Sequence, residues 1–387
     1  MKHSEDLGQR IARIRHQRGL SQTKLARLAS SSRSMIAKIE IARATPSAGM
    51  LGAIANALEV DVERLNGSRD DNPEALHDLV PPIRCALAST DLIAYDVEPR
   101  PLAEIRSDIA QLGEWRRATK YKKIAVVLPD LVNELLVASS EVGEPAFALL
   151  TGAYRAANTI GHKLGYADLS LNAVERMEWA AGHSGDPLLI AMTHYLRAAA
   201  LARIGAGKQA MVLLNRTIDQ VQPLAIADDV AGAVYSALHM KAGTIAAVLT
   251  NRDSANAHLD EAEEFAGQER VIHETVVGPT NVQLHRLAAA VDLGDVGKAG
   301  QIAEDIHIPA GYAKERSSYY WVDTARAYLG MGEVDKAIEA LYEAKELAPE
   351  HFKTSSTIKT TIKAVAAQER RASGSIRALA DFAGIVD

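Results

Sequence analysis

The sequence of 387 residues contains one cysteine, few aromatic residues and no long apolar run. The single thiol, Cys85, closes no internal disulfide and supplies no cysteine-based zinc site. No stretch of about 18 consecutive apolar residues occurs, and the N-terminus lacks the apolar core of a signal peptide. We therefore expect a protein that does not enter a membrane and that works in the cytoplasm.

Motifs that mark common enzyme classes are also absent. The sequence holds no HExxH, no GxSxG, no P-loop and no GxGxxG after an expected strand. The twelve histidines are scattered, as His162 and His183 illustrate, and do not fall at the spacing of metal ligands. We expect no catalytic activity, no metal ion and no cofactor.

The composition that is present favours a helical globular protein. Hydrophobic residues make up 48% of the chain and charged residues 24%, which is typical of a folded protein with large cores. Aromatic residues are only 5%, whereas Ala and Leu are abundant, and this balance favours helices over sheets. The expected fold class is all-α, with two or three structural units over this length.

Charge is distributed unevenly along the chain. Residues 1–68 contain eleven Lys and Arg against six Asp and Glu, so their net charge is +5. The remaining residues have a net charge of −11, which gives −6 for the whole chain. A small basic segment joined to a large acidic one is compatible with a nucleic-acid reader that has a separate second function.

Residues 7–65 have the pattern of five short helices. Apolar residues recur at helical spacing, starting with Leu7, Ile11 and Ile14. Gly19 can end the first helix, and a serine can cap each of the next three helices: Ser21, Ser32 and Ser47. The expected inner faces of the later helices hold Leu25, Leu28, Ile36, Ile39, Leu51, Ile54, Leu58 and Leu65.

A connecting region is expected at residues 66–101. Residues 67–73 are polar and contain glycine and proline without periodicity, which indicates a linker. A helical segment around 75–90 follows, and Pro99 and Pro101 predict irregular structure at 91–101.

Residues 102–387 repeat a two-helix unit. The clearest copy, residues 319–350, resembles a tetratricopeptide repeat, with two helices around Gly330-Met331-Gly332. Small residues expected near the start of each second helix recur at intervals of 38 to 45 residues: Ala125, Ala167, Ala210, Ala255, Ala299 and Ala337. Stacked pairs of this kind form an α-solenoid with a concave face, which we expect to bind an effector, to mediate dimerisation, or both.

The segment from Leu7 to Leu65 resembles the lambda-repressor/Cro (XRE) family of helix-turn-helix DNA-binding domains. The resemblance rests on Gly19-Leu20-Ser21-Gln22, Leu25-Ala26, Ser32-Arg33-Ser34, Ile39-Glu40, the Pro46-Ser47 break and the helix with Leu51, Ile54 and Leu58. Where the family usually has glycine and then a bulky aliphatic residue in the turn, this chain has Ser30 and Ser31.

The resemblance implies a set of DNA contacts. The second helix of the motif enters the major groove, so Arg33, Ser34 and Lys38 would face the bases, with Arg33 suited to a guanine edge. Gln22 corresponds to the family's phosphate anchor, and Thr23, Ser32 and Arg43 would add contacts. Glu40 is expected to form an ion pair within the domain, with Arg10 as a candidate partner. Such a domain usually binds a palindromic operator as a homodimer.

An XRE domain joined to helical repeats is similar to the peptide-responsive quorum-sensing regulators of Gram-positive bacteria. The resemblance implies a transcriptional regulator whose concave face binds a peptide or a small molecule. The repeat register suggests these effector contacts: Asn158, Tyr195, Lys241, Asn281, His285, Tyr319 and Arg326. In the alternative hypothesis, the repeats bind a partner protein and the helix-turn-helix only localises this scaffold on DNA.

Overall fold

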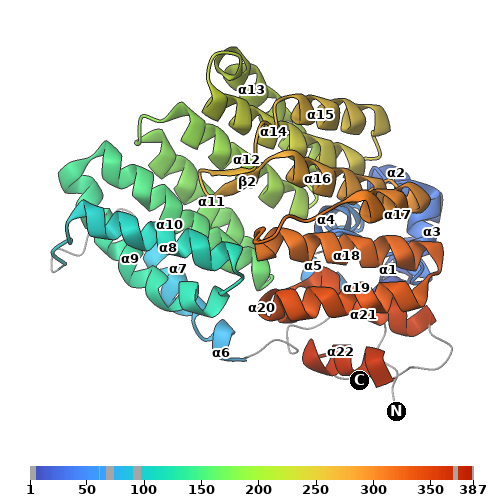
Figure 1. Cartoon of the computed structure of the whole chain (residues 1–387). Helices are drawn as coiled ribbons and strands as arrows, with labels where there is room; N and C mark the ends of the chain where they lie inside the picture. Colours follow the sequence, from blue (N-terminus) through green and yellow to red (C-terminus); the bar gives the residue numbers. More distant parts are fainter. Residues whose placement is uncertain (1–5, 61, 67–73, 90–96, 369–373, 386–387) are drawn as a thin grey trace.

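The computed structural model describes residues 6–60, 62–66, 74–89, 97–368 and 374–385. These residues are almost entirely helical, which confirms the all-α prediction, and the exception is a two-stranded hairpin (Figure 1). No helix among the described residues is both long and apolar enough to cross a membrane.

The five N-terminal helices form a compact head. They are α1 (Leu7–Gln17), α2 (Gln22–Leu28), α3 (Arg33–Glu40), α4 (Ala48–Ala57) and α5 (Val62–Asn66). The three predicted serine caps are confirmed: Ser21, Ser32 and Ser47 each accept a hydrogen bond from the backbone N–H three residues later. Because a cap fixes where a helix begins, these serines set the start of α2, α3 and α4.

The core of the head contains the predicted apolar stripe, with one exception. Ile11, Leu25, Ile36, Ile54 and Leu58 are fully buried. The expectation for Leu28 is wrong, because its side chain is 50% exposed at the end of α2, beyond the reach of the core.

Beyond the head, only part of the predicted connection can be compared. The expected linker at 67–73 and residues 90–96 of the expected irregular stretch lie outside the described residues. The predicted helical segment around 75–90 comprises α6 (Glu74–His77) and α7 (Val80–Ala88). Residues 97–101 are non-helical, as expected from Pro99 and Pro101.

The body is a row of six helical hairpins (Figure 1). Their first helices are α8 (Leu102–Arg117), α10 (Glu144–Lys163), α12 (Pro187–Arg203), α14 (Asp229–Val248), α16 (Pro279–Asp292) and α18 (Lys314–Met331). Their second helices are α9 (Tyr121–Val142), α11 (Ala167–Gly182), α13 (Gly207–Ala225), α15 (Arg252–Glu264), α17 (Val296–Asp305) and α19 (Val334–Leu347). The predicted solenoid of helical hairpins is confirmed.

The alanine register also matches the second helices. Ala210, Ala255, Ala299 and Ala337 are each fully buried at the fourth position of their helix. Ala125 and Ala167 also lie near the start of their helices but are offset, at the fifth position of α9 and the first of α11, where the buried Ser170 takes the fourth position. Small residues at this point let the two helices of a hairpin cross closely.

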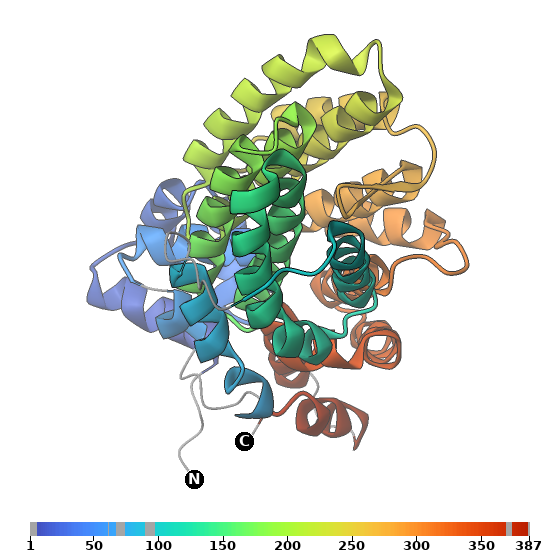
Figure 2. The same cartoon turned by 90° about the vertical axis from the view of Figure 1, so that its left-hand side faces the viewer.

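The two ends of the row of hairpins meet, so the body curves round a central space (Figure 2). Arg116 of α8 donates to Glu315 of α18 at 2.7 Å, although the two residues are 199 positions apart. Tyr121 of α9 lies 3.2 Å from the ring nitrogen Nδ1 of His351. These contacts close the solenoid on itself.

A short hairpin that the sequence did not predict strengthens this closure. It comprises β1 (Arg270–Ile272) and β2 (Thr275–Val277), paired antiparallel. His273 and Glu274 form its two-residue turn with positive φ angles of 41° and 64°, the geometry of a tight hairpin turn. The carbonyl oxygen of Glu274 accepts hydrogen bonds from Arg116 and Arg155, so the hairpin tip is held against α8 and α10.

Three more helices follow the last hairpin: α20 (Pro349–Thr354), α21 (Ser356–Gln368) and α22 (Gly374–Phe382). Helix α21 packs on α18 and α19 and reaches the head. Thr361 of α21 lies 3.3 Å, between hydroxyl oxygens, from Thr45, and Gln368 donates to the carbonyl of Ala42 at 2.8 Å.

Candidate DNA-reading helix and effector cavity

The predicted DNA-contacting residues lie together on the head. Thr23, Ser32, Arg33, Ser34 and Arg43 are exposed, and Gln22 and Lys38 are partly exposed. Arg33 and Ser34 occupy the first turn of α3, whose other face buries Met35, Ile36 and Ile39 against the head core. The side chains of Arg33 and Ser34 are therefore exposed at the N-terminal end of α3.

Two side chains near this face are also held inside the head. The hydroxyl of Ser32 accepts a hydrogen bond from the backbone N–H of Met35 at 3.0 Å. The side-chain amide of Gln22 donates to Glu40 at 2.8 Å, which fixes the amide at the start of α2. A phosphate contact from Gln22 would use its remaining donor.

The expected partner of Glu40 is wrong. Glu40 forms a bidentate ion pair with Arg15, with N–O distances of 2.6 and 2.9 Å, whereas Arg10 donates to the carbonyl of Leu65. Burial alone would raise the pKa of Glu40, but the hydrogen bonds from Arg15 and Gln22 lower it overall. Arg10 and Arg15 both lie in α1, and sequence spacing does not tell which guanidinium reaches Glu40.

The turn between α2 and α3 carries a strained residue. Ser30, where the related family usually has glycine, adopts a φ of 51° in the left-handed region. Its carbonyl oxygen accepts a hydrogen bond from the hydroxyl of Thr250 in the body at 2.9 Å. The motif turn is thus in direct contact with the solenoid.

The head is docked on the body over a wide area. Helix α4 packs on α12 and α14, and Val248 of α14 belongs to the apolar core of the head. Gly52 of α4 lies so close to α12 that a Cβ there would be 2.2 Å from the carbonyl oxygen of Arg203. Close approach of two backbones requires glycine at this point.

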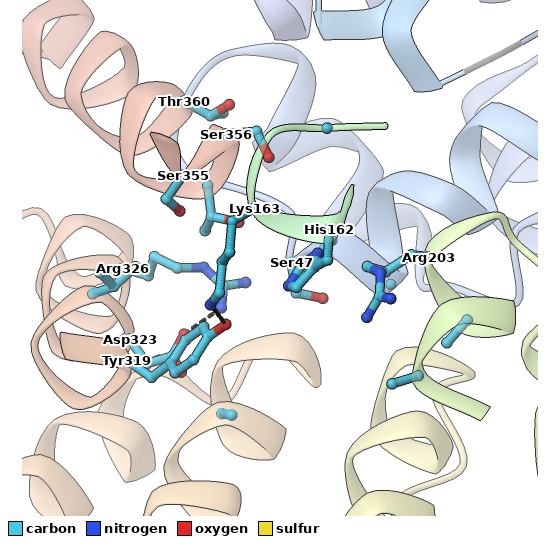
Figure 3. Close-up of a pocket in the computed structure, with 18 of the residues that line it drawn as sticks. Ser47, His162, Lys163, Arg203, Tyr319, Asp323, Arg326, Ser355, Ser356 and Thr360 are labelled. Atoms are coloured by element: carbon cyan, nitrogen blue, oxygen red, sulfur yellow. Dashed lines mark hydrogen bonds and ion pairs between the residues drawn. The ribbon is translucent and has the colours of Figure 1, made fainter. Parts of the chain in front are cut away.

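A cavity of about 400 Å³ lies where the head meets the concave side of the body. Its walls include Ser47, Ala48 and Gly49 of the head together with residues of α10, α12, α14, α16, α18 and α21. Figure 3 shows Arg203 across the cavity from Tyr319, Asp323 and Arg326, with Ser355, Ser356 and Thr360 on α21 and its approach.

Four of the seven predicted effector residues line this cavity: Lys241, His285, Tyr319 and Arg326. The other three do not line it. Asn158 is buried against Ser170, Tyr195 lies beneath Lys241, and the amide of Asn281 donates to the carbonyl of Val276. The repeat register places residues on the right helices, but small rotations decide which side chains reach the cavity.

Arg326 is engaged within the protein. Its guanidinium donates to Asp292, to Asp323 and, twice, to the carbonyl of Thr45, and the side chain is buried. It can form the wall of a binding site, but few of its donors remain for a ligand.

Several cavity residues were not predicted from the sequence: His162, Lys163, Arg203, Arg316, His351 and Lys363. Two of these residues have a recognisable pattern in the sequence. Lys163 and Arg203 each stand two residues before a glycine that ends the first helix of a hairpin, Gly165 and Gly205. Basic residues at the same position of successive repeats face the same central space.

Comparison with known proteins places the head in a family. Residues 6–66 match the family of helix-turn-helix domains. A segment of 61 residues is 46% identical to the immunity repressor protein of Bacillus phage phi105; it covers 16% of this chain and 42% of the repressor. The chain therefore spans less than half the length of this curated relative.

A solved structure is also similar in part. It is that of PlcR of Bacillus thuringiensis in complex with the peptide PapR7 and DNA, with 18% sequence identity and a TM-score of 0.30. The match covers 68% of this chain and 94% of the PlcR chain. On its own sequence match, the head is a helix-turn-helix domain, and the structure joins it to a body of helical hairpins.

Proposed function

We propose that this protein is a sequence-specific, DNA-binding transcriptional regulator. The observation that carries the proposal is the exposed first turn of α3, which presents Arg33 and Ser34 on a rigid, capped helix of a helix-turn-helix head. An arginine fork matches the two acceptors of a guanine edge, so Arg33 reads a base, while Gln22, Thr23, Ser32, Lys38 and Arg43 contact the backbone or neighbouring bases.

The body then acts as the sensor. Its concave side holds a cavity of about 400 Å³ in contact with the head, lined by apolar and charged side chains, which supports effector binding over docking of a flat partner surface. The effector is a peptide or small molecule, and the protein binds a two-fold operator as a homodimer, as is common for heads of this type.

Selection of binding sites from genomic fragments with the purified full chain tests this proposal. The recovered fragments should share a palindromic motif, and sedimentation should show two protein chains on each site. Arg33→Ala should then weaken binding to that motif by about 10- to 100-fold, because a bidentate base contact contributes about 1–3 kcal/mol.

Arg216→Ala provides the matched control, since Arg216 is an exposed arginine of the body remote from α3. It should leave DNA affinity unchanged. Recovery of no common motif, or equal affinities of the Arg33 and Arg216 variants, would contradict base reading by α3.

A further inference from the structure

The cavity between head and body has a strong excess of positive charge. Eight Lys and Arg side chains line it, against two carboxylates, Asp292 and Asp323. Both carboxylates form ion pairs with Arg326, so they do not neutralise the remaining cations. In an acidic body, this concentration of positive charge is a local feature of the cavity.

These cations include Arg203, Lys241 and Arg316, none of which forms an ion pair within the described part of the chain. Arg203 donates to the hydroxyl of Ser170 at 2.9 Å, which is a neutral partner. Lys241 lies 4.7 Å from the ring centre of Tyr195, and Arg316 lies 4.8 Å from that of Tyr319. All three side chains are half-buried, and cations partly withdrawn from water are stabilised by a counter-charge, so the cavity favours an anionic ligand.

Polar groups other than the cations also point to a ligand. The Nε2 atoms of His285 and His351 are buried, line the cavity and have no hydrogen-bond partner. The first turns of α4 and α21 contribute Ala48, Gly49, Ser356 and Thr357 to the wall. Backbone N–H groups at the start of a helix favour an anion.

Burial and nearby cations lower the pKa values of the two cavity histidines. Burial, followed by the charges of Lys241 and Arg316, lowers the pKa of His285 well below its ordinary value. Burial and then Lys163 do the same for His351, partly offset by Glu315. Burial lowers the pKa of Arg203 to about 10, which still leaves this guanidinium charged at neutral pH.

We propose that the cavity binds a compact ligand with two or more negative charges, either phosphate or carboxylate groups, held by Arg203, Lys241 and Arg316 against the first turn of α4. The inference rests on the proposed function in that it defines the chemical class of the effector. A cavity of about 400 Å³ falls at the lower end of small-molecule sites, which favours a metabolite over an extended peptide.

The ligand would touch both head and body. Ser47 and Gly49 belong to the head, whereas Arg203 and Lys241 belong to α12 and α14. A ligand that binds only when both surfaces are in place stabilises the docked head by its own binding free energy. This links the effector to the position of the DNA-reading helix.

Calorimetric titration of the full-length chain, without DNA and at constant ionic strength, tests the inference. The probes are inorganic pyrophosphate and citrate, which distinguish phosphate from carboxylate ligands, with acetate as a singly charged control. We expect saturable binding of pyrophosphate or citrate and none of acetate. Arg203→Gln and Lys241→Gln should each weaken that binding at least tenfold.

Lys208→Gln and Arg216→Gln are matched controls, because both side chains are exposed on α13 outside the cavity. They should change the affinity less than twofold. Circular dichroism shows whether each variant is folded. If Arg203→Gln does not fold, Lys241→Gln alone tests the inference, because it removes only a charge above Tyr195.

Absence of saturable binding by both multivalent probes would overturn the inference, as would equal affinities of the cavity and control variants. Binding of a neutral peptide in place of both anions would also overturn it. The proposed DNA function is judged separately by the dependence of operator binding on Arg33. Loss of that dependence with anion binding intact would reject the DNA-reading assignment alone.

Discussion

Arg326 of α18 donates two hydrogen bonds, at 2.9 and 3.1 Å, to the carbonyl oxygen of Thr45 in the loop between α3 and α4. The two residues are 281 positions apart, and both are buried. The same guanidinium pairs with Asp292 and Asp323, so one side chain joins the head to two helices of the body. Folding of the body therefore fixes the position of the head.

Arg326→Met should destabilise the protein by about 3–5 kcal/mol, because Asp292 and Asp323 would remain buried without their counter-charge. Urea unfolding of the full chain measures this change. Adding Asp292→Asn and Asp323→Asn should recover much of the loss. Lys336→Met, which removes an exposed pair with Glu333, should have no measurable effect. A loss below about 1 kcal/mol for Arg326→Met would argue against the buried network.

Gly52→Ala should separate α4 from α12, because the new Cβ would lie 2.2 Å from the carbonyl oxygen of Arg203. Hydrogen exchange should show faster exchange in α4 and at the end of α12, with the rest of the body unchanged. Gly297→Ala is the control, since a Cβ there meets nothing within 4 Å. Unchanged protection of α4 in the Gly52 variant would mean that the head is not packed as described.

Ser30→Gly should stabilise the head. A left-handed conformation costs a non-glycine residue about 1–2 kcal/mol, whereas the added freedom of glycine in the unfolded chain costs about 0.4–1 kcal/mol. The net gain is about 0.5–1 kcal/mol in thermal or urea unfolding. Ser34→Gly, inside the exposed face of α3, should instead destabilise by a similar amount. Equal signs for the two variants would contradict the strain at φ 51°.

Stability should fall as the pH drops below about 6.5. Burial is the largest cause that lowers the pKa values of His162, His285 and His351, so these side chains stay neutral in the folded protein. In the unfolded chain, these histidines bind protons once the pH falls below their ordinary pKa. Each histidine then lowers the free energy of unfolding by up to about 1.4 kcal/mol per pH unit. Above that pKa the effect is absent.

His285→Gln isolates one of these groups. In urea unfolding between pH 7.5 and 5.5, its stability should depend less on pH than that of the parent chain. His307→Gln, at an exposed position, should keep the parental dependence. A parental slope in the His285 variant would show that this histidine is protonated to the same extent in both states.

The elements that depend on neighbouring residues could be predicted from the sequence. A serine cap acts over three residues, and an alanine between two helices of one hairpin acts over one repeat, so Ser21, Ser32, Ser47 and most of the alanine series were found. Errors arose where one helical turn changes the outcome. Arg10 and Arg15 both lie on α1, and only Arg15 reaches Glu40.

The docking of the head could not be predicted in this way. It depends on the fit of Gly52 against Arg203 and on the reach of Arg326 to Thr45, both of which join distant parts of the chain. The polar linker expected at 67–73 suggested a separable head, yet Val248 of the body packs in the core of the head, and Ala202 lies beside Gly49 of α4. The cavity arises from this docking, so Arg316 had no local signature as a binding residue, and the only local signal for Arg203 was Gly205 two residues later.

The closed solenoid has a consequence for how this architecture can vary. An open array of repeats can gain or lose a unit at little cost, because each unit contacts only its neighbours. Here the contact of Arg116 with Glu315 joins the first hairpin to the last, and the tip at Glu274 holds α8 against α10. One hairpin more or fewer would separate Arg116 from Glu315, so duplication or deletion of a unit would open the ring. New specificity would then come from replacement of side chains in a ring with the same number of hairpins.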